Sequence, residues 1–381
     1  MKFIHLSDLH LGIRVNEFSL IEDQEYILAE ILKIIESESP DAVIIAGDIY
    51  DKPVPTLEAV TLFDDFLTRV AMRNLKVFVI SGNHDSPERI AFGWRLMRMS
   101  GVYMSQIYNG VMPKVTLTDK FGPIDVYMLP FVKPAHVRRY FPDDNDTINT
   151  YTDAVRKAVQ VMEVDTSIRN VLVTHQFVTG AAKCESEEVS VGGSDNVDAS
   201  VFTPFDYVAL GHIHTPQNVG SPNIRYCGTP LKYSFSEVRS NKSVTVVEMS
   251  EKGNVNVHEI PLVPKRDMVE LKGSYNELTL KSFYDGTTYR DDYTHITLTD
   301  DEDIPDAIGK LRVIYKNIMR IDYDNKRTRY DMSITNSESV EVKSPVELFG
   351  EFYEKQNNQP MSDVQRNYIN ELIEKIQERA L

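Results

Sequence analysis

The sequence contains only two cysteines among its 381 residues, and Cys184 and Cys227 are too far apart to form a CxxC motif. This scarcity excludes a framework of several disulfides and gives no basis for a zinc site built from thiolates. We therefore expect both cysteines to be ordinary reduced thiols.

Long apolar runs are also missing. No stretch approaches the roughly 20 apolar residues that a membrane-crossing helix needs. The N-terminal residues 1–8 read as a short strand rather than as a signal peptide. We expect no membrane association and a cytoplasmic location.

Positive charge is scarce, with 41 Lys and Arg residues against 57 Asp and Glu residues and a formal net charge of −16. Proteins that bind DNA normally present a Lys- and Arg-rich surface to its phosphates. Taken alone, the charge favours another kind of partner. Bound divalent cations or a partner subunit could supply the missing positive charge. Five basic residues near the motifs described below are candidate phosphate contacts: Arg14, Lys52, Arg89, Arg95 and Lys232.

Short apolar runs alternate with segments of helical periodicity, which predicts an α/β fold. Nearly continuous apolar strands are buried on both faces, so we expect a sheet covered by helices. An apolar stripe from Ile27 to Ile35 predicts a helix that ends at Ser39-Pro40, and a second helix is expected over residues 56–72. The apolar runs cover residues 3–6, 42–45, 77–80, 171–173 and 207–210.

Each of these runs is followed by polar residues that can bind metal. Imidazole, carboxylate and amide oxygen are ligands of manganese, iron and zinc, and the carboxyl ends of strands are where α/β sheets gather ligands. The candidates are Asp8, His10, Asp48, Asn83, His84, His175, His212 and His214. The four remaining histidines are expected to be ordinary polar side chains: His5, His136, His258 and His295.

The spacing within two of the motifs predicts convergence. Residues two apart on a strand point to the same face, so Asp8 should join His10, and His212 should join His214. Leu9 and Ile213 would then face the core. Glycines next to the ligands would leave room for a crowded pocket and permit sharp turns: Gly47, Gly82 and Gly211.

The ordered set Asp-Leu-His, Gly-Asp, Gly-Asn-His-Asp, Thr-His and Gly-His-Ile-His resembles the motifs of the calcineurin-like metallophosphoesterases. The flanking segments 5–12, 46–51 and 225–237 resemble those of the SbcD family, the nuclease subunits of bacterial DNA-end-processing complexes. The resemblance covers residues 1–265 and is weaker beyond them. It implies the calcineurin-like metallophosphoesterase fold, in which β-sheet layers are flanked by helices.

This resemblance implies two bound divalent metal ions, with Mn²⁺ expected and iron or zinc as alternatives. One metal would be held by Asp8, His10, Asp48 and His214. The other would be held by Asp48, Asn83, His175 and His212, with the Asp48 carboxylate as the bridge. His84 would act as the general acid. Either Asp51 or Asp85 could orient its imidazole, and the resemblance favours Asp51.

The resemblance also implies a domain order. It places a metallophosphoesterase nuclease domain at residues 1–265, a small α+β capping domain at 266–343, and a helical segment at 344–381 that binds an ATPase partner of the SbcC type. A homodimer formed through residues 56–72 and 88–99, within a heterotetramer with that ATPase, is expected.

The implied activity is cleavage of DNA ends in repair, recombination and replication, as a 3′ to 5′ exonuclease on duplexes and an endonuclease on single strands or hairpins. One alternative is a phosphoesterase that acts on a nucleotide or another non-DNA phosphodiester. Another is a scaffold that mainly tethers the partner to DNA. The additional modules after residue 265 argue against the first alternative, and the complete ligand set argues against the second.

Overall fold

The computed structural model describes residues 1–144, 146–187, 195–302, 304–325, 349–350, 352–354, 360–369 and 372. The chain forms two compact units. The first comprises Met1–Leu298 and Ile304–Asp322, and the second comprises Thr299–Asp303 and Tyr323–Leu381.

The first unit contains a six-stranded sheet in the order β14-β13-β1-β4-β5-β6. Four of its strands are parallel, and β13 and β14 run antiparallel at one edge. The bounds are β1 Lys2–Leu6, β4 Ala42–Ala46, β5 Lys76–Ile80, β6 Val102–Met104, β13 Ser243–Met249 and β14 Val255–Pro261.

A second six-stranded sheet has the order β11-β12-β10-β9-β8-β7. Its four inner strands are parallel, and the two edge strands are antiparallel to their neighbours. The bounds are β7 Lys114–Asp119, β8 Gly122–Leu129, β9 Arg169–His175, β10 Tyr207–Gly211, β11 Gln217–Val219 and β12 Ser221–Tyr226.

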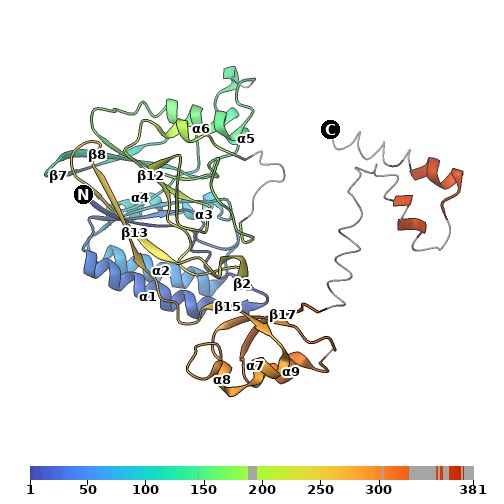
Figure 1. Ribbon diagram of the computed structural model, residues 1–381. Coiled ribbons are helices and arrows are strands. Elements are labelled where there is room, and N and C mark those ends of the chain that lie inside the picture. Colours follow the sequence, from blue (N-terminus) through green and yellow to red (C-terminus); the bar gives the residue numbers. More distant parts are fainter. Residues whose placement is uncertain are drawn as a thin grey trace. The chain divides into compact units, whose positions relative to one another are not determined.

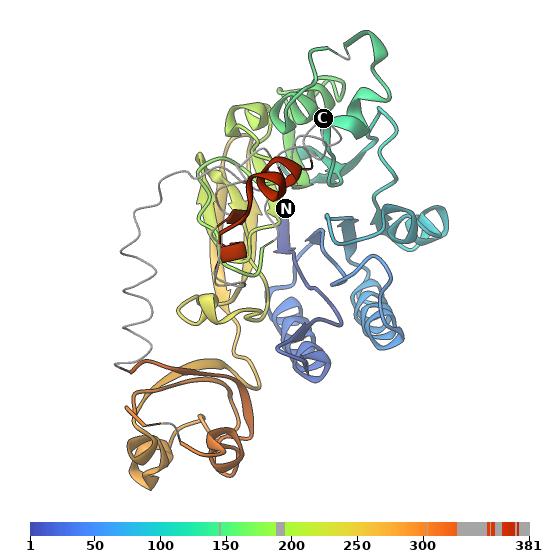
Figure 2. The same cartoon turned by 90° about the vertical axis from the view of Figure 1, so that its right-hand side faces the viewer.

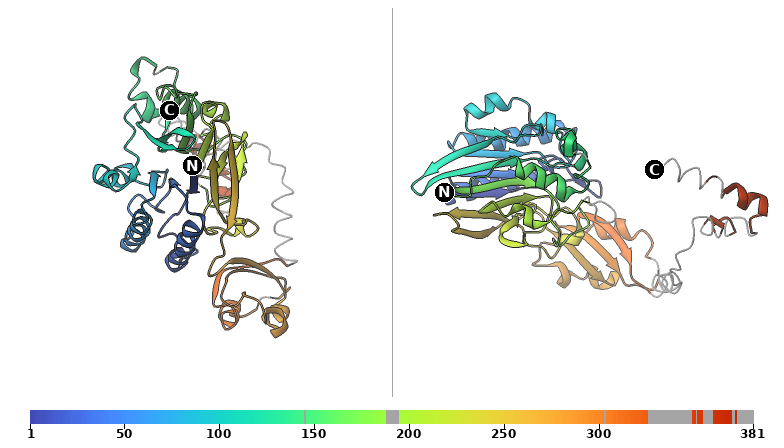
Figure 3. Two further views of the ribbon diagram at one scale, coloured as in Figure 1. Left: turned by 90° about the vertical axis from the view of Figure 1, so that its left-hand side faces the viewer. Right: turned by 90° about the horizontal axis from the view of Figure 1, so that it is seen from above.

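The two sheets lie face to face, with helices on the outer face of each (Figures 1 and 3). Side chains such as Phe78 and Val173 form a core between the sheets. Helices α1 (Ile21–Glu38) and α2 (Leu57–Ala71) cover the first sheet. Helices α5 (Pro134–Arg138) and α6 (Tyr151–Gln160) cover the second. The α/β prediction and both predicted helices are confirmed.

The fold implied by the resemblance, β-sheet layers flanked by helices, is confirmed, whereas the apolar runs alone predicted only a sheet covered by helices. Each sheet has helices on one face and the other sheet on its second face. An apolar strand is equally well buried by a helix or by a second sheet, so its sequence does not distinguish the two arrangements.

Short elements connect these layers. They are β2 Arg14–Val15, β3 Phe18–Ser19, α3 Pro87–Ile90, α4 Trp94–Met99 and the 3₁₀ turns η1 Pro142–Asp144, η2 Ala199–Phe202 and η3 Phe235–Glu237.

A small α+β module follows β14 within the first unit, and Figure 2 shows it in orange. Its sheet has the order β15-β16-β17, with strands Met268–Gly273, Tyr293–Leu298 and Asn317–Tyr323. Its helices are α7 Tyr275–Thr279, α8 Lys281–Tyr284 and α9 Ala307–Arg312. The module is joined to α1 at Asp23, which accepts hydrogen bonds from Arg266 at 2.9 Å and Tyr293 at 2.7 Å.

Most of the segment expected to bind a partner, residues 344–381, lies outside the described residues. Its described part includes a helical stretch at residues 363–369, where Ser362 and Gln365 form reciprocal capping hydrogen bonds. Among the described residues, no helix combines the length and the apolar character required to cross a membrane.

Candidate metal centre

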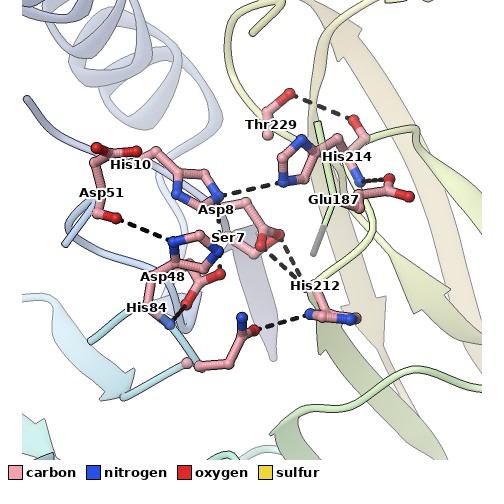
Figure 4. A network of polar contacts seen from close by, with 12 residues as sticks. Ser7, Asp8, His10, Asp48, Asp51, His84, Glu187, His212, His214 and Thr229 are labelled. Carbon is pink, nitrogen blue, oxygen red and sulfur yellow. Dashed lines mark hydrogen bonds and ion pairs between the residues drawn. The ribbon is translucent and has the colours of Figure 1, made fainter. Parts of the chain in front are cut away.

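The candidate ligands gather where parallel strands of both sheets end. Asp8, Asp48 and Asn83 follow β1, β4 and β5 of the first sheet, and His175 is the last residue of β9 in the second. His212 follows β10. Figure 4 shows Asp8, Asp48 and His212 from close by. The stacking of the two sheets therefore brings together residues that are far apart in the sequence.

The predicted mechanism of convergence within the short motifs was wrong. Asp8 and His10 lie beyond the end of β1, and both have left-handed backbone, with φ of 52° and 43°. His212 lies beyond β10 and has φ of 101°. The ligands therefore converge through turns rather than through strand alternation. Leu9 and Ile213 are fully buried, as expected.

The glycines next to the ligands lie where other atoms of the site approach the backbone too closely for a Cβ atom. A Cβ on Gly82 would lie 2.0 Å from Asp48 Oδ1, and one on Gly47 would lie 2.5 Å from His175 Nδ1. A Cβ on Gly211 would lie 2.0 Å from the carbonyl oxygen of Ala46. These distances are far below contact distance, so the packing of the site requires glycine at all three positions.

One group of ligand atoms comes from Asp8, His10 and His214, and these atoms lie within 4.8 Å of one another. The Nε2 atoms of His10 and His214 face each other at 3.2 Å. All three residues are almost fully buried. Burial lowers the pKa of His10 well below its usual range, so this ring is neutral and able to bind a metal.

A second group surrounds Asp48 and Asn83. Asp48 Oδ2 lies 3.2 Å from His175 Nε2 and 3.7 Å from His10 Nε2, so one carboxylate oxygen faces both groups. Asn83 Oδ1 lies 3.0 Å from His175 Nε2 and 2.9 Å from His212 Nδ1. Asp48 occupies the position that a bridging carboxylate requires.

The donor set fits two divalent metals. The Nδ1 of His175 lies 2.8 Å from the carbonyl oxygen of Ala46, which can only accept a hydrogen bond. Nδ1 therefore carries the hydrogen, and the Nε2 lone pair is left to face Asp48. An imidazole lone pair facing a carboxylate at 3.2 Å is unfavourable unless a proton or a metal ion lies between them.

The electrostatics of the site agree with this requirement. Burial alone would lower the pKa of His175, but the negative charge of Asp48 outweighs it and raises this pKa to about 9. Burial also opposes ionisation of Asp48, yet the nearby His175 holds its pKa well below the usual range. Burial lowers the pKa of His212 to about 3. The buried Asp48 carboxylate thus favours a cation beside it, either a proton on His175 or a metal ion.

His84 lies at the edge of this cluster. Its ring stands perpendicular to that of His10 with centroids 4.8 Å apart, and a ring nitrogen lies within 4.8 Å of ligand atoms of His10 and Asp48. Its backbone N–H donates to Asp48 Oδ1 at 2.9 Å. His84 Nδ1 lies 3.0 Å from the main-chain carbonyl oxygen of Asp51.

The two acidic candidates for orienting His84 differ in their contacts. The contact from Asp51 uses its main-chain oxygen (Figure 4), so it does not depend on the carboxylate. The Asp85 carboxylate accepts hydrogen bonds from the backbone N–H groups of Ile49, Tyr50 and Gly82 at 2.9–3.1 Å. Burial raises the pKa of Asp85 to about 7. Asp85 therefore braces the turns that carry Asp48 and Asn83.

Sequence reasoning missed the residues behind the ligands. Ser186 Oγ lies 2.8 Å from His214 Nδ1, and the backbone N–H of His214 donates to Glu187 at 2.7 Å. Glu237 and Tyr233 lie in segment 225–237, and the Tyr233 hydroxyl donates to the Leu9 carbonyl at 2.6 Å. The resemblance of this segment to the SbcD family is the sequence feature that could have pointed to Glu237 and Tyr233.

One of the proposed phosphate contacts is unsuited to that role. Lys232 is mostly buried, forms an ion pair with Asp267 at 2.9 Å and donates to the carbonyl of Val238 at 2.8 Å. A lysine engaged in this way is not available to a DNA phosphate.

Comparison with known proteins agrees with the site geometry. Residues 1–216 match the family model described as calcineurin-like phosphoesterase. The whole chain is 31% identical over 385 residues to the SbcD subunit of nuclease SbcCD from Staphylococcus epidermidis, and the match covers 100% of both sequences. The chain belongs to the SbcD family.

Membership in the SbcD family extends to the C-terminal part. Residues 264–357 match the SbcD_C model, described as type 5 capsule protein repressor C-terminal domain. Among solved structures, a dimetal phosphatase from Danio rerio is 11% identical with a TM-score of 0.40, covering 69% of this chain and 99% of that one. TT1561 of Thermus thermophilus is 10% identical with a TM-score of 0.35, covering 68% and 98%.

Proposed function

We propose that this SbcD family member is the nuclease subunit of a two-component complex and hydrolyses phosphodiester bonds at DNA ends. The observation that carries the proposal is the constellation around Asp48, which combines two groups of metal-binding atoms in a chain that matches a nuclease subunit over its full length. The proposed reactions are 3′ to 5′ exonuclease cleavage of duplexes and endonuclease cleavage of single strands or hairpins.

The proposed ligands are Asp8, His10, Asp48 and His214 for one ion, and Asp48, Asn83, His175 and His212 for the other. Two bound ions would supply charge stabilisation to the attacking and leaving oxygens. Mn²⁺ is the proposed metal, and iron and zinc suit the same nitrogen and oxygen ligands.

In this proposal His84 donates a proton to the leaving oxygen. The carbonyl of Asp51 can only accept a hydrogen bond, so His84 Nδ1 retains its hydrogen in both protonation states. Nε2 is therefore the ring atom that exchanges a proton with the substrate. Asp51 would orient His84 through its main chain.

DNA cleavage by the purified chain with Mn²⁺ tests the proposal, with linear duplex and hairpin substrates in the presence and absence of the ATPase partner. Wild type should cleave both substrates, whereas His84→Gln should not. An inactive wild type that hydrolyses a small phosphodiester would instead establish the non-DNA phosphoesterase alternative. If the complexes formed by wild type and by His84→Gln bind DNA equally well and neither cleaves it, the scaffold alternative would be established.

We further propose that an SbcC-type ATPase binds segment 344–381, because the family match reaches beyond the small module to residue 357. A chain that ends at residue 343 should retain DNA cleavage by the isolated subunit and lose co-purification with the ATPase. Retention of the ATPase by the shortened chain would place the docking site elsewhere.

A homodimer is proposed through α2 and the α3–α4 segment. Residues of α2 and α3–α4 line a common groove, which includes Val60, Phe63 and Met97. Phe92, which lines the same groove, is 81% exposed, and Met99 at the end of α4 is 85% exposed. Exposed apolar side chains concentrated on two neighbouring elements are typical of a surface that another subunit covers.

A further inference from the structure

A buried ion pair lies directly behind the candidate ligand His214. Glu237 is 1% exposed and Lys242 is 5% exposed, and the Lys242 ammonium contacts the Glu237 carboxylate. The same ammonium donates to the carbonyl oxygen of His214 at 2.9 Å and to Thr229 Oγ1 at 2.7 Å. Burying two charges costs more than most ion pairs return in stability, so this pair calls for an explanation other than stability.

Ser186 links this ion pair to the imidazole of His214. Its hydroxyl lies 2.6 Å from Glu237 Oε1 and 2.8 Å from His214 Nδ1. An ionised carboxylate can only accept, so the single hydroxyl hydrogen of Ser186 is donated to Glu237. The Ser186 oxygen then accepts a hydrogen bond from His214 Nδ1–H. The thiol of Cys184, 3.0 Å from the same oxygen, is a weak additional partner.

This chain of hydrogen bonds determines which nitrogen of His214 is available. With the hydrogen on Nδ1, the lone pair of His214 is on Nε2, the atom that faces His10 Nε2 at 3.2 Å. The main chain of His214 is held at the same time, because its N–H donates to Glu187 and its carbonyl accepts from Thr229 N–H at 3.1 Å. Hydrogen bonds on the side of His214 away from His10 therefore fix both the tautomer and the position of its ring.

We propose that Glu237, acting through Ser186 and held in place by Lys242, is a positioning residue that presents His214 Nε2 to the metal ion shared with Asp8 and His10. This inference rests on the proposed function, since it requires the metal centre. Groups that orient a metal-binding histidine in this way typically change metal affinity by 10- to 100-fold when they are removed.

Ser186→Ala is the decisive variant, because it breaks the link and leaves the buried ion pair intact. Titration calorimetry of metal-free protein with Mn²⁺ should show two binding events in wild type. In Ser186→Ala one of them should weaken by about 10- to 100-fold while the other stays unchanged. Ser186→Thr keeps a hydroxyl at this position and should restore the wild-type affinity.

Glu237→Gln should weaken the same binding event. The matched control is Asp119→Asn, which removes the carboxylate paired with the buried Arg169. Arg169 begins β9 and the ligand His175 ends it, so this control lies about 20 Å along the strand from the centre at 3.3 Å per residue. Both Mn²⁺ affinities should be unchanged in this control.

The outcomes separate the two proposals. Unchanged affinities in folded Ser186→Ala would overturn the positioning role and leave the metal centre intact. A wild-type chain that binds no Mn²⁺, iron or zinc would overturn the metal centre itself. If Glu237→Gln does not fold, Ser186→Ala and its Ser186→Thr counterpart decide the question.

Discussion

Several residues of the candidate metal centre hold backbone conformations that L-amino acids usually avoid. Asp8, His10, Asp48 and His212 all have positive φ, between 43° and 101°. Such conformations cost on the order of 1–3 kcal/mol each and persist where the surrounding structure imposes them. These strained turns follow directly after buried strands, and they direct the carboxylate and imidazole groups toward one another.

His84 and Asp48 should respond differently to neutral substitutions. His84→Gln should retain both metals and lose cleavage, because the imidazole is proposed to transfer a proton rather than to bind metal. Asp48→Asn should lose both metals, because its carboxylate faces both groups of ligands. Metal content of the purified variants, measured by mass spectrometry, checks this, and a metal-free His84→Gln would make His84 a ligand.

His5 should give the fold a measurable sensitivity to acid. It is fully buried, lies 2.9 Å from the Tyr207 hydroxyl, and has its pKa lowered by burial to about 3, with a further contribution from Arg225. In the unfolded chain a histidine binds a proton below about pH 6.5. The unfolded state therefore binds more protons as pH falls, and folding stability decreases.

Between pH 7 and pH 5 this effect amounts to about 2 kcal/mol. Urea unfolding in EDTA should show that wild type loses about that much more stability over this range than His5→Gln, whose side chain does not titrate. Parallel pH profiles for the two proteins would show that folding does not shift the pKa of His5.

At the scale of elements, α4 has no buried residue, although it adjoins the proposed dimer surface. Leu96→Glu places a charge among the exposed apolar groups of α3–α4, where the proposed dimer would bury it at a cost of several kcal/mol. Light scattering should give a dimer for wild type and a monomer of 43.5 kDa for the variant. Leu280→Glu, at a residue 56% exposed on the small module, is the matched control.

Elements also show what the sequence could and could not predict. Helical periodicity was enough to predict α1 and α2. Strand-length apolar runs followed by Asp, Asn or His were enough to predict the α/β class and the set of candidate ligands. The apolar pattern alone did not predict that two sheets pack together, because Val173 is buried in the same way under a helix or a second sheet. The sheet layers were predicted from the family resemblance. Ser186 was missed because a serine acquires its role only through the contacts of His214 and Glu237.

At the scale of the whole molecule, the candidate ligands add a further link between two sheets that are already joined by apolar packing and by polar contacts such as His5–Tyr207 and Arg225–Glu259. Asp48 and Asn83 come from the first sheet, and His175 and His212 come from the second. Metal bound to all four should therefore stabilise the sandwich as a unit. One site filled at 100 times its Kd adds about 2.7 kcal/mol of stability.

Metal removal tests this coupling. Thermal unfolding midpoints should rise when Mn²⁺ is added to EDTA-treated wild type and should stay constant for Asp48→Asn. An equal rise in both proteins would mean that Mn²⁺ stabilises the chain at a location other than this centre.

The pairing of β1 also limits when the enzyme can form. Lys2 lies opposite Glu248 in the antiparallel pair of β1 and β13. The first strand therefore cannot complete its pairing until the ribosome has synthesised β13, about 240 residues later. At 5–20 residues per second, that wait on the ribosome is roughly 12–50 seconds. During this time one edge of β1 is unpaired, and His214 is not yet in contact with His10. We therefore expect a nascent chain of this protein to be inactive, and to expose an aggregation-prone strand edge, until the two sheets have packed together.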